Sequence, residues 1–159
     1  QLILDHYPVD SFLDIAGSLA FDVSMVNVGG TLYSLRQIIE ILTTKTMNDP
    51  ALFFMLPCGA QSCPAYPERS LTAQDLSERF SDRVQQYLAR PGIFEFDRGE
   101  QTLAVNELLY TFRDVFDGLT GLLQTLSRFV DSEEDAAFVR TFPAENIGYL
   151  PVDWSLTAP

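Results

Sequence analysis

Apolar residues recur at three- and four-residue steps through residues 106–130, a pattern typical of one long helix with a wide apolar face. Asn106 suits the N-cap position, Glu107 the first turn and Arg128 the last turn. Ordering the backbone of such a helix costs more free energy than burial of its apolar side chains contributes. The helix is therefore unstable alone in water, and the rest of the chain must cover it. We therefore predict a central buried helix whose apolar positions are Leu108, Phe112, Val115, Phe116, Leu119, Leu122, Leu123, Leu126, Phe129 and Val130.

Shorter patterns predict the elements around this helix. Helical spacing occurs at residues 32–44 and 73–90, with shorter helices expected at 11–16 and 136–141. Apolar and polar residues alternate over 19–28, whereas 51–56 is a continuous apolar run; both are expected to be strands. The glycines at 29 and 30 are expected to turn the first strand into the helix that Thr31 caps, so that 19–56 forms a parallel strand–helix–strand crossover.

A hairpin completes the predicted sheet, because strand-like residues 93–96 and 102–105 flank the turn at 97–100. The predicted class is α+β: a small mixed or antiparallel sheet of three to five strands packed against three main helices, with the helix at 106–130 central. The length of 159 residues fits one domain, and no internal repeat marks a boundary.

Two stretches of the chain, one internal and one at the C-terminal end, lack a regular pattern. Residues 57–70 are expected to form a loop, and residues 144–159 an irregular C-terminal arm. The arm either docks on the domain through Tyr149, Leu150 and Trp154 or uses them to bind a partner, and both interpretations stay open.

The formal net charge of −12 limits the classes of partner. It opposes nucleic-acid binding, which depends on neutralising phosphates with Lys and Arg. A partner with a basic patch fits this charge, although acidity also serves solubility alone. Because no apolar run approaches the roughly 20 residues that a membrane helix needs, we predict no membrane insertion. The expected partners are other protein chains, in an oligomer or a complex.

The two cysteines, Cys58 and Cys63, lie five positions apart across a Gly-containing turn. This spacing allows a small disulfide ring, which implies a periplasmic or secreted protein. Unpaired thiols, the alternative, would fit the cytoplasm. Zinc needs further ligands and His6 is the sole histidine, so no metal or other cofactor is predicted.

No stretch of the sequence carries a recognisable catalytic motif. The sequence at 28–31 lacks both the dinucleotide-binding glycine pattern and the P-loop lysine, and a tight turn explains its glycines. Residues 131–135 resemble the start of a calcium loop but lack its sixth-position Gly and twelfth-position Glu, which favours an acidic helix start. No catalytic residue is therefore assigned.

Three functional hypotheses remain, and the first is preferred. In this hypothesis the chain is a non-catalytic protein–protein interaction or structural assembly subunit, with an extracytoplasmic complex as its setting. Alternatively, it is an acidic inhibitor or immunity-type protein that binds a basic partner, or an enzyme that depends on carboxylates or on Cys58 and Cys63.

Overall fold

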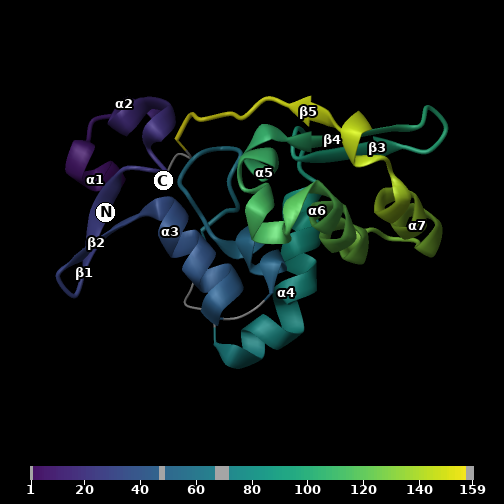
Figure 1. Ribbon diagram of the computed structural model, residues 1–159, viewed down its shortest axis with the longest axis horizontal. Coiled ribbons are helices and arrows are strands. Elements are labelled where there is room, and N and C mark those ends of the chain that lie inside the picture. Colours follow the sequence, from purple (N-terminus) through teal and green to yellow (C-terminus); the bar gives the residue numbers. More distant parts are fainter. Residues whose placement is uncertain (1, 47–48, 67–71, 157–159) are drawn as a thin grey trace. The chain divides into compact units, whose positions relative to one another are not determined.

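The structure is a computed structural model that describes residues 2–46, 49–66 and 72–156 (Figure 1). The chain divides into two compact units: unit 1 comprises Gln1–Tyr66 with Asp153–Pro159, and unit 2 comprises Pro67–Val152. The predicted α+β class is confirmed, since helices accompany a two-stranded and a three-stranded sheet. The single domain at 1–159 stays a prediction. Parts of the predicted loop (67–70) and of the predicted arm (157–159) lie outside the described residues.

The sheet of unit 1 is an antiparallel hairpin of β1 (Ser24–Val28) and β2 (Thr31–Ser34). Its turn residues, Gly29 and Gly30, have φ of 61° and 88°, the left-handed conformation that a two-residue hairpin turn requires at both positions. The Asn27 side-chain oxygen accepts a hydrogen bond of 3.0 Å from the Gly30 N–H. The expected strand-to-helix turn is therefore wrong, because the two glycines fold the chain back into a second strand.

The helices of unit 1 begin at other residues than expected. Ser34 caps α3 (Leu35–Glu40) in a capping box with Gln37, so the predicted cap at Thr31 is wrong. A π-helical segment follows α3 at Ile41–Thr46. The apolar run predicted as a strand is a 3₁₀ helix, Pro50–Met55, so the described residues of 19–56 form no parallel crossover. Unit 1 also contains α1 (Leu2–His6), α2 (Leu13–Ala16) and a 3₁₀ turn at Gly17–Leu19.

Unit 2 contains a mixed three-stranded sheet in the order β3-β4-β5. The predicted hairpin is confirmed as β3 (Phe94–Asp97) antiparallel to β4 (Thr102–Asn106). Strand β5 (Gly148–Leu150) pairs in parallel with β4, so this part of the arm predicted as irregular is a strand. The predicted helices near 73–90 and 136–141 are present as α4 (Ala73–Leu88) and α7 (Glu133–Thr141).

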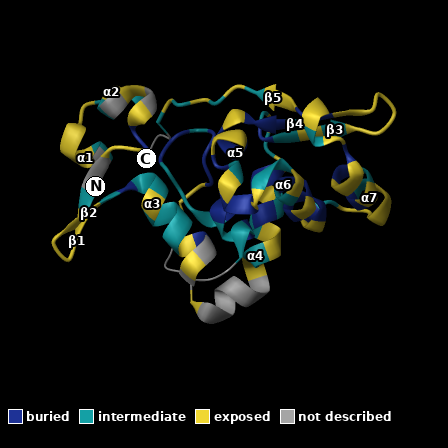
Figure 2. Ribbon diagram, in the orientation of Figure 1, coloured by how far each residue is buried: buried dark blue, intermediate teal, exposed yellow. Residues whose placement is uncertain are grey.

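The stretch at 106–130 is helical but broken. It consists of α5 (Glu107–Thr111), a 3₁₀ turn at Arg113–Phe116, α6 (Gly118–Leu126) and a second 3₁₀ turn at Ser127–Phe129. The prediction of one continuous helix is wrong, because Asp117 and Gly118 adopt φ of 63° and 87°. Its apolar face is nevertheless buried as predicted (Figure 2), with Leu119 and Val130 half-buried and these residues fully buried: Leu108, Phe112, Val115, Phe116, Leu122, Leu123, Leu126 and Phe129.

Candidate functional site

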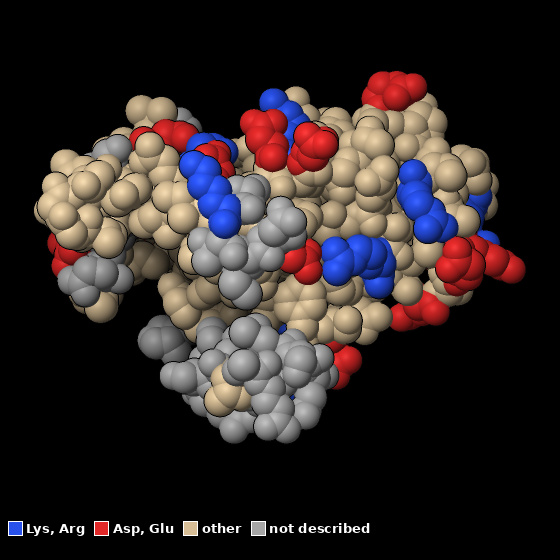
Figure 3. All heavy atoms as spheres, turned by 60° about the horizontal axis from the view of Figure 1, so that its bottom comes forward, with Lys and Arg blue, Asp and Glu red and all other residues tan. Residues whose placement is uncertain are grey.

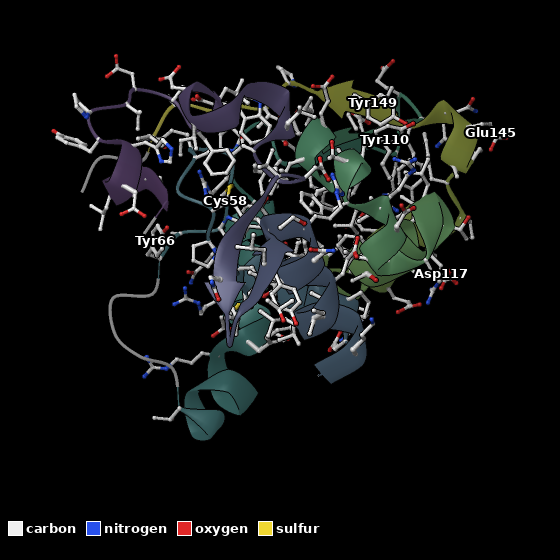
Figure 4. The ribbon with its side chains drawn as sticks, turned by 60° about the vertical axis from the view of Figure 1, so that its left-hand side comes forward. Cys58, Tyr66, Tyr110, Asp117, Glu145 and Tyr149 are labelled. Carbon is white, nitrogen blue, oxygen red and sulfur yellow. A yellow bond between two sulfur atoms is a disulfide. The ribbon has the colours of Figure 1, made fainter. Side chains whose placement is uncertain are left out.

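Two exposed tyrosines of unit 2 lie in direct contact (Figure 4). Tyr110 on α5 and Tyr149 on β5 are 38% and 46% exposed, and their ring centroids lie 4.7 Å apart at an interplanar angle of 64°. The Arg113 guanidinium lies 4.5 Å from the Tyr110 centroid, and its Nη1 donates a 3.0 Å hydrogen bond to the Tyr110 carbonyl. These three residues, hereafter the tyrosine patch, combine an aromatic surface with an oriented cation.

Local structure explains why the three side chains meet. In the parallel pairing of β4 with β5, Val105 lies opposite Tyr149, and Asn106 immediately afterwards caps α5. Tyr110 is thereby held one helical turn from the sheet. Arg113 follows three residues later, at a spacing that brings side chains together on a helical surface.

The environment of the patch raises the pKa of the Tyr149 phenol above its ordinary value. Desolvation is the largest cause and Tyr110 adds to it, while Arg113 lowers the pKa. Like any tyrosine, Tyr149 is protonated near neutral pH, where its phenol offers both a hydrogen-bond donor and an acceptor.

The residues predicted to bind a partner belong to different units of the chain. Tyr149 and the half-buried Leu150 belong to unit 2, whereas Trp154 belongs to unit 1. Trp154 stacks on Phe12 with ring centroids 6.0 Å apart and contacts Phe21 at the same distance. Sequence reasoning missed Tyr110 and Arg113. Their three-residue spacing outside the apolar stripe is the signal that points to them.

The predicted Cys58–Cys63 disulfide is present, with the two Cα atoms 5.6 Å apart. Residues inside its ring bind the tail at 153–156. The Gln61 and Ser62 N–H groups donate to the carbonyls of Ser155 and Asp153 at 2.8 and 3.1 Å. The disulfide ring thus shapes the backbone that holds the tail.

The segment at 10–12 holds the other side of the same tail. The Phe12 N–H donates to the Trp154 carbonyl, and the Leu156 N–H donates to the Asp10 carbonyl, both at 3.1 Å. The tail segment therefore lies between two parts of unit 1, and this placement agrees with the docked interpretation of Trp154.

Replacing both cysteines with serine should lower the free energy of unfolding by about 2 kcal/mol, because the six-residue ring no longer restricts the unfolded chain. Hydrogen exchange at the Gln61 and Ser62 amides should accelerate as the tail loosens. Ala65→Ser, at an exposed position just beyond the ring, is the control and should change neither quantity. Unchanged exchange in the double variant would contradict the role assigned to the ring.

The chain matches no family model, no curated protein and no solved structure. The tyrosine patch and the disulfide ring are therefore the features from which a function is inferred.

Other candidate sites have structural explanations. Ser132 caps α7 by accepting a 3.0 Å hydrogen bond from the Asp135 N–H, while Arg98 pairs with Glu134 and Asp135 at 2.8 and 2.9 Å. The stretch at 131–135 is thus the predicted acidic helix start. Figure 3 shows acidic and basic side chains next to one another on one face of the molecule. Within the described part of the chain, no three His, Cys, Asp or Glu residues gather as metal ligands, and no helix has the length and apolarity to cross a membrane.

Proposed function

We propose that this chain is a non-catalytic interaction subunit that binds another protein through the tyrosine patch. The contact between exposed Tyr110 and Tyr149, with Arg113 fixed over one ring, carries the proposal. Tyrosine and arginine are enriched among the residues that dominate binding energy at interfaces. Because these side chains already contact one another, they have less conformational entropy to lose on binding.

Net charge favours a different protein over a second copy as the partner. Two copies would each carry a formal charge of −12 and repel one another, whereas a basic partner is attracted. The disulfide supports an oxidising compartment, so we place the complex in the periplasm or outside the cell.

Photo-cross-linking from position 149 in the native cell tests this proposal. With benzoylphenylalanine in place of Tyr149, the chain should form one defined adduct, identified by mass spectrometry. The partner so identified should then bind the Tyr149→Ala variant about 30-fold more weakly, since truncating an interface hot spot costs about 2 kcal/mol.

The matched control is Tyr66, which is 60% exposed and belongs to unit 1. Tyr66→Ala should bind the identified partner as tightly as the unaltered chain. Equal cross-linking from positions 66 and 149, or full binding by Tyr149→Ala, would reject the patch as the interface.

A further inference from the structure

A groove of about 560 Å³ crosses the three-stranded sheet of unit 2. All three strands contribute to it, together with the hairpin turn and the segment after α7. Its lining combines apolar side chains, polar side chains and carboxylates, from Glu95, Phe96, Asp97, Gln101, Thr102, Leu103, Ala104, Phe142, Asn146 and Gly148.

The groove owes part of its space to a glycine that the backbone does not require. Gly148 is exposed on β5 and has no positive φ, so other residues could adopt its conformation. A Cβ at this position would lie 3.3 Å from the Cβ of Ala104 on the neighbouring strand. Glycine within a strand often marks a place where a ligand or another backbone approaches closely.

The charges along the groove all have one sign. In the strand register, Glu95, Ala104 and Gly148 form one row across the sheet, and Asp97 lies opposite Thr102 in the next row on the same face. Among the described residues that line the groove, there is neither Lys nor Arg. Each carboxylate also holds its own turn: Glu95 accepts from the Gly92 N–H at 3.0 Å, and Asp97 accepts from the Gly99 N–H at 2.7 Å.

The nearest basic residue of the hairpin is already paired. Arg98 binds Glu134 and Asp135, and these contacts raise the pKa of its guanidinium. Because Arg98 pairs with these two residues, it does not neutralise Glu95 and Asp97, whose carboxylates can pair with a cation of a bound partner.

We infer that this groove binds an extended segment of a partner protein in which Arg or Lys alternates with apolar residues. An extended backbone fits closely at Gly148 and Ala104, and its cationic side chains meet Glu95 and Asp97. Successive side chains of an extended segment point to opposite sides, so cationic residues at every second position reach Glu95 and Asp97 together. None of the three residues of the tyrosine patch lines the groove, so the two proposals rest on different residues and either can fail alone.

A decapeptide of alternating arginine and valine, capped at both ends, is the probe. Titrated into the ¹⁵N-labelled full chain at 0.15 M salt, it should shift the amide resonances of Thr102, Ala104 and Gly148. The double variant Glu95→Gln/Asp97→Asn keeps the oxygens that accept the turn N–H groups but removes both charges. It should bind about tenfold more weakly, as expected for two exposed ion pairs.

Glu100→Gln is the matched control, because Glu100 lies exposed in the same hairpin turn but does not line the groove. Its affinity for the peptide should be unchanged, which shows that removing one charge from this hairpin away from the groove does not weaken binding. Gly148→Thr should weaken peptide binding, because the added side chain fills part of the groove, whereas threonine itself suits a strand. The inference is overturned if the arginine–valine peptide does not bind, or if Glu95→Gln/Asp97→Asn binds it as tightly as Glu100→Gln does. It is also overturned if a glutamate–valine peptide binds the unaltered chain as tightly as the arginine–valine peptide.

Discussion

Asn106→Asp should lower the free energy of unfolding by about 4 kcal/mol at neutral pH, because it places a carboxylate in a fully buried site between two carbonyl groups. The Asn106 side-chain amide donates to the carbonyls of Gly92 and Pro151 at 2.7 and 3.1 Å. Its oxygen accepts from the Leu108 N–H at 3.0 Å and so caps α5. One side chain thus joins the turn before β3, the residue after β5 and the helix that carries Tyr110.

The free energy of unfolding that Asn106→Asp loses should increase as pH rises. Burial beside two carbonyl oxygens favours the protonated carboxyl and raises its pKa in the folded state above the value of about 3.9 in the unfolded chain. The folded state then binds more protons, so the penalty is smallest below pH 4 and grows as pH rises. Urea unfolding of both proteins at pH 4 and pH 7 measures this change.

Asn27→Asp is the control, because it makes the same substitution at an exposed position. The Asn27 side chain is exposed, and its oxygen only accepts a hydrogen bond, which a carboxylate does equally well. Its effect on stability should stay within about 0.5 kcal/mol at either pH. A similar loss at both positions would show that the buried donor bonds of Asn106 do not carry the effect.

Asn106 also shows where sequence reasoning stops. Its role as N-cap follows from neighbouring residues, and the structure confirms it. Its bonds to Gly92 and Pro151 span 14 and 45 residues, and no local pattern contains them. The parallel pairing of β4 with β5 also joins distant residues, and for that reason the local sequence predicts only an irregular arm at β5.

Apolar patterns predicted burial better than conformation. Ala51, Phe53 and Phe54 are buried as expected, yet their segment is a 3₁₀ helix, because a short apolar run has no period that distinguishes strand from helix. The candidate sites divide in the same way. The cysteine pair is local and was predictable, whereas Tyr110 meets Tyr149 only through the pairing of distant strands.

Gly121→Ala should destabilise unit 2 by about 3 kcal/mol, although alanine normally stabilises a helix by up to about 1 kcal/mol relative to glycine. A Cβ at Gly121 would overlap the backbone carbonyl oxygen of Phe116 and lie 2.9 Å from its carbonyl carbon. Phe116 is itself buried, and the left-handed residues Asp117 and Gly118 place its carbonyl against α6. The clash therefore cannot be relieved without moving the break between the two helical segments.

Thr120→Ala in the same helix separates this clash from helix propensity. Thr120 is exposed, so its replacement should leave stability unchanged or raise it by a few tenths of a kcal/mol. Urea unfolding compares both variants with the unaltered chain, and hydrogen exchange at the α6 amides localises the loss. If Gly121→Ala proves as stable as Thr120→Ala, the Phe116 carbonyl does not lie against α6, and the break at Asp117 is not the reason that glycine occupies position 121.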